Sequence, residues 1–239
     1  MSKPKMIHFP TQEAFVGKVF FLPFNRDASA TKKLAASMNV NGFTQPLMLI
    51  KTDLIDGVMR MYVADGQHRA LTALSIGIPF RGELLPNTFA RREEIVTFVA
   101  SHNSSQLPWS VTDYVRAFAS VGSSEYLKLI DIKKKTTFTF TTLATMLSSA
   151  SHRSSVNDPL KNGLFRIDRL DDTMKTLDYA GELSKYRPLT NRMVISLQRV
   201  MNMSIFNKKK FTKSYKDYAK ELSKLQLDNF DQTFISWLQ

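Results

Sequence analysis

Hydrophobic and polar positions alternate in two different ways along the 239-residue chain. In the first half, short apolar runs are separated by turn signals, a pattern typical of strands mixed with short helices. In the second half, apolar residues recur at three- and four-residue steps, which is the spacing of one helix face. The pattern therefore predicts an α+β chain, with an α/β domain over residues 1–104 and a mostly α-helical domain over residues 105–239.

The α/β half is expected to contain a hairpin turning near Asp56-Gly57, and residues 1–10 carry no clear element. Gly42 and Gly77 are predicted to end the first and second helices. We expect helices over 28–39, 67–77 and 89–101, and strands over 47–50, 58–64 and 79–85.

The helical half begins with Ser110, a good N-cap supported by Asp113, and Gly122 is expected to end that helix. Residues 163–167 are predicted to form a β wing, and the segment 151–163, which contains Pro159, lacks helical periodicity. Further helices are expected over 124–133, 141–149, 169–185, 189–203 and 211–226.

The net charge of the chain indicates the kind of partner that it binds. The chain has 33 Lys and Arg against 21 Asp and Glu, a formal net charge of +12. Residues 1–110 hold 12 basic and 8 acidic residues, whereas 111–239 hold 21 and 13. An anionic partner is therefore expected, nucleic acid first, and it should meet the second half.

Two features that the sequence lacks exclude some classes of protein. The chain contains no cysteine, so thiolate zinc sites, iron–sulfur clusters and disulfides are excluded, and a reducing compartment is favoured. The longest apolar run, Val19 to Phe24, is far shorter than the roughly 20 residues of a membrane helix, and no signal-peptide core is seen. We expect a cytoplasmic protein without membrane contact.

The most informative motif is Tyr62-Val63-Ala64-Asp65-Gly66-Gln67-His68-Arg69-Ala70, a strand, a tight turn and a helix start. The first N–H groups of a helix lack partners and carry positive partial charge, so a phosphate is well received there. Arg69 would add a bidentate clamp and His68 a further donor. The alternative is an ordinary strand–turn–helix junction in which Asp65 caps the helix.

This motif resembles the DGQHR branch of the ParB/sulfiredoxin superfamily. The likeness includes Asn25-Arg26, the helix after it, the segment Gly42-Phe43-Thr44-Gln45-Pro46-Leu47, and Asp65 to Ala73, covering roughly residues 10–104. A second stretch, Asn103 to Tyr114, is similar to a junction in ParB-like proteins of phages and mobile elements. The resemblance implies an N-terminal ParB/sulfiredoxin-like α/β domain.

The resemblance also implies a nucleoside triphosphate, ATP or CTP with Mg²⁺. The implied nucleotide-binding residues are Gln45, Gly66, Gln67, His68, Arg69 and Asn103. Sulfiredoxins use a cysteine where this chain has Gln67, so that reductase reaction is excluded. ParB proteins that hydrolyse CTP have a Glu-Arg pair where this chain has Gln67 and His68.

A lysine stripe in the last predicted helix is the main candidate for contact with DNA. Phe211, Tyr215 and Leu222 recur on the opposite side, so the lysines either track a phosphate backbone or form a solvated face. A second basic cluster has aromatic residues nearby. The stripe is Lys209, Lys213, Lys216, Lys220 and Lys224, and the second cluster is Lys133, Lys134 and Lys135.

Three functional hypotheses follow. The first is a ParB-like, nucleotide-regulated DNA-binding protein of a phage, plasmid or other mobile element. Its expected partners are DNA and a second copy of the chain in a homodimer, and plasmid partition is an example of its role. The second is an ATPase, phosphoryl-transfer or nuclease enzyme of the same superfamily, with Asp65 or His68 as the catalytic acid or base. The third is an interaction module with a decayed nucleotide site. No protein-held metal is expected in any of them.

Overall fold

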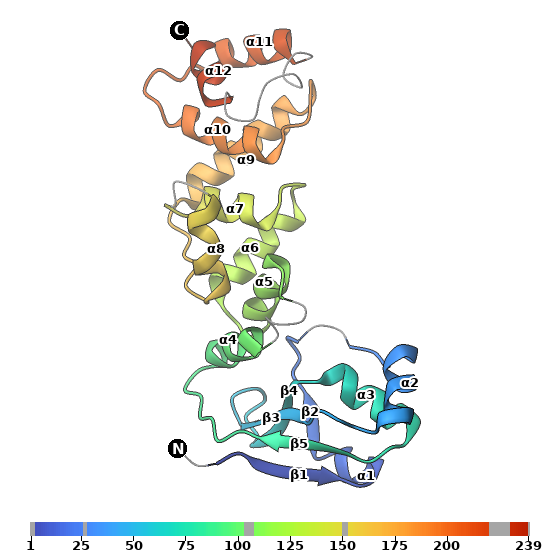
Figure 1. Cartoon of the computed structure of the whole chain (residues 1–239). Helices are drawn as coiled ribbons and strands as arrows, with labels where there is room; N and C mark the ends of the chain where they lie inside the picture. Colours follow the sequence, from blue (N-terminus) through green and yellow to red (C-terminus); the bar gives the residue numbers. More distant parts are fainter. Residues whose placement is uncertain (1–2, 26–27, 103–107, 150–152, 220–229, 239) are drawn as a thin grey trace. The chain divides into compact units, whose positions relative to one another are not determined.

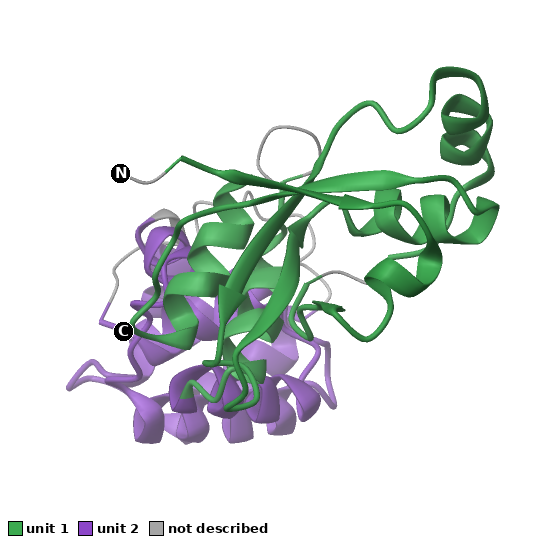
Figure 2. Cartoon of the chain, turned by 90° about the horizontal axis from the view of Figure 1, so that it is seen from below, with its two compact units in different colours: residues 1–123 green, residues 124–239 purple. Residues whose placement is uncertain are grey.

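The computed structural model describes residues 3–25, 28–102, 108–149, 153–219 and 230–238. The chain divides into two compact units, Met1–Ser123 and Ser124–Gln239, which Figure 2 colours green and purple. The domain boundary expected after residue 104 lies outside the described residues.

Unit 1 is built on a mixed sheet of five strands in the order β1-β5-β3-β4-β2. The strands are β1 Lys5–Phe9, β2 Val19–Phe21, β3 Leu47–Thr52, β4 Arg60–Asp65 and β5 Phe80–Leu84. β3 and β4 form the predicted antiparallel hairpin, and β1 pairs antiparallel with β5. The other two pairings, β2 with β4 and β3 with β5, are parallel.

Helices cover both faces of this sheet. The helices of unit 1 are α1 Gln12–Phe15, α2 Lys32–Asn41, α3 Gln67–Ile76, α4 Arg92–His102 and α5 Val111–Ser120 (Figure 1). One sheet face places Leu47, Leu49 and Val63 in a core with residues of α1, α2 and α3. Because side chains alternate along a strand, Tyr62 lies on the other face, where α4 contacts β4.

Unit 2 is helical over all of its described elements. They are α6 Ser124–Lys134, α7 Phe140–Leu147, α8 Arg153–Lys161, α9 Leu170–Leu183, α10 Asn191–Met201, α11 Lys208–Tyr218 and α12 Phe230–Ser236. A buried amide joins three of them: Gln198 of α10 donates to Met146 O of α7 at 3.1 Å and to Thr173 Oγ1 of α9 at 3.0 Å. A buried polar group is tolerated because its partners are supplied, and here they fix how the three helices pack.

The α+β class is confirmed, as are the predicted helices whose caps are local in sequence. Ser110 and Asp113 form a reciprocal capping box at the start of α5, and Gly77 ends α3. Each helix predicted in the second half has a counterpart, although residues 220–226 of the last one lie outside the described residues.

Three expectations were wrong. Residues 5–9 form edge strand β1, which pairs with a strand distant in sequence. Residues 163–167 form no strand; Phe165 is buried there against Tyr126, with ring centroids 5.8 Å apart. The segment 151–163 contains helix α8 despite Pro159.

Tertiary contacts explain α8. Val156 and Leu160, four residues apart, are almost fully buried. The Tyr126 hydroxyl donates to Leu160 O at 2.9 Å and lies 3.2 Å from Pro159 O, so it supplies a donor to carbonyls at the helix end. None of the helices in the described part of the chain is long and apolar enough to cross a membrane.

Candidate functional site

The junction between β4 and α3, which we call the α3 elbow (Asp65 to Arg69), carries the predicted nucleotide-binding motif. β4 ends at Asp65, and α3 begins at Gln67. Between them Gly66 has φ 93° and ψ 20°, a left-handed conformation that favours glycine. A Cβ at Gly66 would come within 2.9 Å of Arg69 Nη2 and of Leu47 Cδ2, so a side chain at this turn would require both neighbours to move.

The first turn of α3 has no side-chain cap. Helical bonding begins with Ala70 N–H donating to Gly66 O at 2.9 Å, and the N–H groups before it point out of the helix start. Asp65 does not cap α3, because its Oδ2 accepts from Arg69 Nη2 at 2.8 Å. The elbow therefore presents backbone donors at the positive end of a ten-residue helix.

Arg69 is engaged with the protein itself. Besides the ion pair with Asp65, its Nη1 donates to Gln45 O and to Pro46 O, both at 2.9 Å. The Arg69 side chain is 20% exposed, and that of Asp65 is 35% exposed. Arg69 thus ties the Gln45-Pro46 segment to the elbow, and a phosphate clamp formed by Arg69 would have to share or break these contacts.

His68 links the elbow to the segment before α2. Its Nδ1 lies 2.9 Å from Ser29 O and 3.2 Å from Ser29 N, and the residue is exposed. Nearby, Thr31 N–H donates to Thr72 Oγ1 of α3 at 3.3 Å. Sequence reasoning missed the Ser29 contact, since nothing local relates positions so far apart in the chain.

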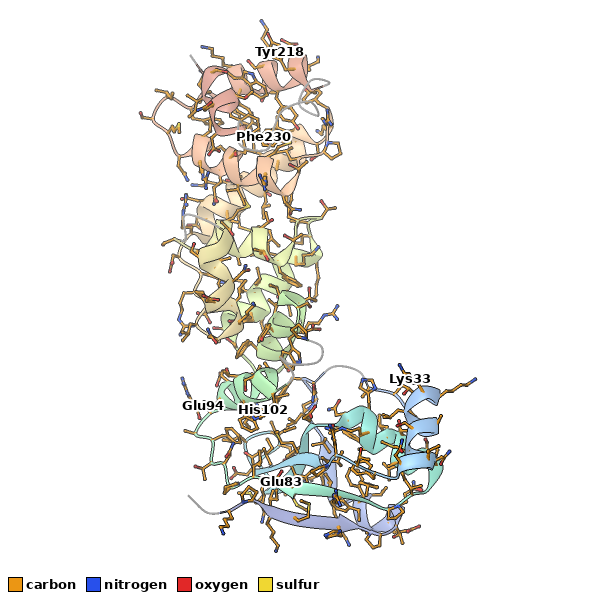
Figure 3. The ribbon with its side chains drawn as sticks, in the orientation of Figure 1. Lys33, Glu83, Glu94, His102, Tyr218 and Phe230 are labelled. Carbon is orange, nitrogen blue, oxygen red and sulfur yellow. The ribbon has the colours of Figure 1, made fainter. Side chains whose placement is uncertain are left out.

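The remaining nucleotide-site residues are placed as follows. Gln67 is buried at the first position of α3, and Gln45 is exposed, with its carbonyl bound to Arg69. Lys33, which is not one of the predicted site residues, is exposed in the first turn of α2, and Figure 3 shows its side chain extending away from that helix. Asn103 lies outside the described residues.

The second candidate region, which we call the lysine face, is the exposed side of α11. Lys208, Lys209, Lys213 and Lys216, with Thr212, line a shallow hollow of about 580 Å³. On the opposite side of α11, Phe211 and Tyr215 are fully buried. This is the division that the residue spacing predicted for residues 209–216; Lys220 and Lys224 lie outside the described residues.

The lysines of this face differ in their partners. Lys208 Nζ lies 2.8 Å from Glu182 Oε2 and 4.8 Å from the Tyr179 ring centroid, and Lys216 Nζ lies 5.8 Å from that of Tyr186. Within the part of unit 2 that the structure describes, no carboxylate pairs with Lys209 or Lys213. These two cations are turned to solvent.

Tyrosine hydroxyls hold the buried side of α11 in place. Tyr215 donates to Arg187 O at 2.9 Å, and burial raises the pKa of Tyr215 to about 12. Burial also raises the pKa of Tyr179, whose hydroxyl is 2.8 Å from Thr212 Oγ1. Tyr218 at the end of α11 stacks on Trp237, with ring centroids 6.2 Å apart, and is labelled in Figure 3.

The predicted cluster Lys133 to Lys135 lies at the end of α6. Lys133 Nζ donates to Thr136 O at 3.4 Å, and Lys134 Nζ pairs with Asp131 at 3.0 Å. Lys134 and Lys135 border a hollow of about 370 Å³ whose wall includes the buried ring of Phe138. That aromatic residue belongs to the core.

Two findings bear on the candidate chemistry. Among the described residues, no group of three or more His, Asp or Glu side chains is arranged to hold a metal ion. Comparison of the chain with protein-family models, with curated proteins and with solved structures finds no match. The likeness to the ParB/sulfiredoxin superfamily therefore stays a prediction from the residues quoted above.

Proposed function

We propose that the chain is a ParB-like, nucleotide-regulated DNA-binding protein of a phage, plasmid or other mobile element. The lysine face of α11 is the observation that carries the DNA part of this proposal. It presents Lys209 and Lys213 to solvent without a carboxylate partner among the described residues, while the other side of the helix is anchored in the core. Phosphate contacts of this kind bind DNA without reading its sequence.

The α3 elbow supports the nucleotide part. A phosphate at the start of α3 would accept from backbone N–H groups that no side chain caps, next to a glycine where no Cβ intervenes. Arg69 then acts as a positioning residue, since it fixes the elbow through Asp65, Gln45 O and Pro46 O. Mg²⁺ would be brought by the nucleotide and would neutralise phosphate charge.

The DNA part is tested by salt dependence. In the triple variant Lys209→Glu, Lys213→Glu, Lys216→Glu, we expect duplex binding to weaken on unrelated sequences and the log–log salt slope to flatten by roughly 0.9 per lost phosphate contact. Fluorescence anisotropy over a salt series measures both quantities. The matched control is Lys128→Glu, Lys161→Glu, Lys175→Glu, which makes the same charge change at exposed positions of α6, α8 and α9.

Equal effects of the two triple variants would show that only net charge matters. An unchanged DNA affinity of the first variant would mean that the lysine face is only a solvated surface.

The nucleotide part is tested by titrating ATP, CTP and GTP with Mg²⁺, with and without DNA, while phosphate release is followed. Binding without release supports regulation. Release or DNA cleavage that Asp65→Asn abolishes would favour the enzyme hypothesis, and no nucleotide binding at all would favour the interaction module.

A further inference from the structure

A further basic surface lies on unit 1, and two of its residues, Arg60 and Met61, directly precede the Tyr62 to Ala70 motif in the chain. Lys5, Lys18, Lys51 and Arg60 line a hollow of about 590 Å³, which we call the sheet hollow. Its apolar lining comes from Ile7, Phe20, Met59, Met61 and Leu84. From these contacts we propose that the sheet hollow binds single-stranded nucleic acid.

The charge of the hollow points to an anion. Lys5 lies on β1, Lys18 in the turn before β2, Lys51 on β3 and Arg60 on β4. The residues that line the hollow include no carboxylate. Lys5, Lys18 and Lys51 are exposed, and none of them forms an ion pair with a described residue. Arg60 pairs with Asp56 at 3.1 Å, which leaves an uncompensated positive charge across the hollow.

The spacing of the cations points to an extended polyanion. Lys5 is in register with Leu84 and then Leu49, and Lys51 is two residues beyond Leu49 on the same face. With strands about 4.8 Å apart and a rise of about 3.3 Å per residue, the Lys5 and Lys51 backbones are separated by about 10 Å across the sheet and about 7 Å along it. Lys18 directly precedes Val19 of β2. Val19 is in register with Met61 of β4, which is in register with Lys51 of β3, so Lys18 lies about two strands beyond Lys51 across the sheet. Such a distribution suits several phosphates in a row better than one.

The apolar lining favours nucleic acid over an acidic peptide. Phe20 is partly exposed, and the Arg60 guanidinium lies 4.5 Å from its ring centroid. Phe20 is in register with Tyr62, and Arg60 lies two residues before Tyr62, so this pair is on the Tyr62 face of the sheet and borders the hollow at the edge strand β2, whereas Lys5 and Lys51 are on the Leu49 face. Aromatic rings and arginine planes are the surfaces on which unpaired bases stack, and methionine adapts its shape to flat partners. Met59 is 55% exposed, so this apolar surface is open to a ligand. Bases in a duplex are stacked on one another, which is why the proposal specifies a single strand.

The test uses the full chain and a fluorescent oligothymidylate of about 12 nucleotides, within the site sizes of single-strand binders. We expect Lys18→Glu with Lys51→Glu to weaken binding about tenfold or more and to flatten the salt slope by roughly 0.7 per lost contact. The matched control is Lys32→Glu with Lys33→Glu, the same charge change at exposed positions of α2. An abasic strand with the same number of phosphates should bind wild-type protein about fivefold more weakly or worse, since its stacking is lost.

The lysine-face triple variant separates this proposal from the proposed function. It should keep oligothymidylate binding at the sheet hollow even where duplex binding is lost, and the sheet-hollow variant should do the reverse. Circular dichroism confirms that each variant is folded. The proposal would be overturned by equal losses in the sheet-hollow double variant and its α2 control. It would also be overturned if the abasic strand bound as tightly as oligothymidylate, or if the protein preferred a polyglutamate peptide of similar length.

Discussion

The α3 elbow and the lysine face both carry cations that the sequence assigned to phosphate, yet the two regions use them differently. At the elbow, both Nη groups of Arg69 are bound to Asp65, Gln45 O and Pro46 O. On the lysine face, Lys209 and Lys213 have no acidic partner among the described residues. A charge bound internally stabilises the fold, whereas a charge left in water is available to a ligand. Residue spacing locates the cations, and only their tertiary partners distinguish these two roles.

The largest expected effect that tests this comparison is at Gly66. We expect Gly66→Ala to lower the free energy of unfolding by about 3 kcal/mol, because an alanine is strained at φ 93° and its Cβ would meet Arg69 and Leu47. Urea denaturation of the full chain measures it. Gly57→Ala is the control, since Gly57 has φ 80° but open space around it, so the difference between the variants reports the close approach alone. Equal losses would mean that Arg69 and Leu47 move enough to admit a Cβ, so that only the backbone conformation of Gly66 is costly.

The next effect is at Arg69. We expect Arg69→Ala to destabilise the protein by about 2 kcal/mol, since two partly buried acceptors, Pro46 O and Asp65 Oδ2, and the exposed Gln45 O lose a charged donor. Arg116→Ala, at an exposed position of α5, removes the same charge and should change stability by less than about 0.5 kcal/mol. Thermal denaturation measures the stability of each variant, and nucleotide titration measures its nucleotide affinity. A variant with unchanged stability but weakened nucleotide binding would make Arg69 the phosphate clamp that the resemblance implies.

The smallest effect is on the buried side of α11. Because burial raises the pKa of Tyr215 to about 12 in the folded state, against 10.0 ordinarily, the fold favours the neutral phenol. That stabilisation is complete below about pH 10 and is lost as pH rises toward 12, since the unfolded chain ionises first. Tyr215→Phe should therefore give a shallower fall of Tm between about pH 10 and 12. It should also cost about 1 kcal/mol at neutral pH through its lost hydrogen bond.

Duplex DNA affinity at neutral pH should not change in this variant, because Tyr215 lies opposite the lysine face. A wild-type slope in Tyr215→Phe would assign the pH dependence to other groups, such as Tyr126 and Tyr179, whose pKa values burial also raises. A large loss of DNA binding would show that the two sides of α11 are not independent.

Elements fixed by neighbouring residues could be predicted from the sequence, and elements fixed by distant residues could not. The Ser110–Asp113 capping box, the β3–β4 hairpin and the Gly77 stop depend on residues a few positions apart. Helix α8 depends on the Tyr126 hydroxyl and on burial of Leu160, which outweigh the local signal of Pro159.

The same rule applies to the candidate sites. The α3 elbow and the stripe on α11 are visible as a motif and a periodicity. The sheet hollow is not, because its cations come from four separate segments that only the strand order brings together. The Ser29 contact of His68 was likewise invisible, since it joins residues 39 positions apart.

The pairing of β1 with β5 determines when unit 1 can close during synthesis. Phe9 is in register with Phe80, so the first strand leaves the ribosome long before its partner. At about 5–20 residues per second, β1 waits several seconds with its backbone groups unpaired. Lys5 and His8 on this strand are exposed polar residues, which disfavour pairing with a nascent neighbour in that interval. Translation speed through residues 10–84 therefore sets how long β1 stays without its partner strand.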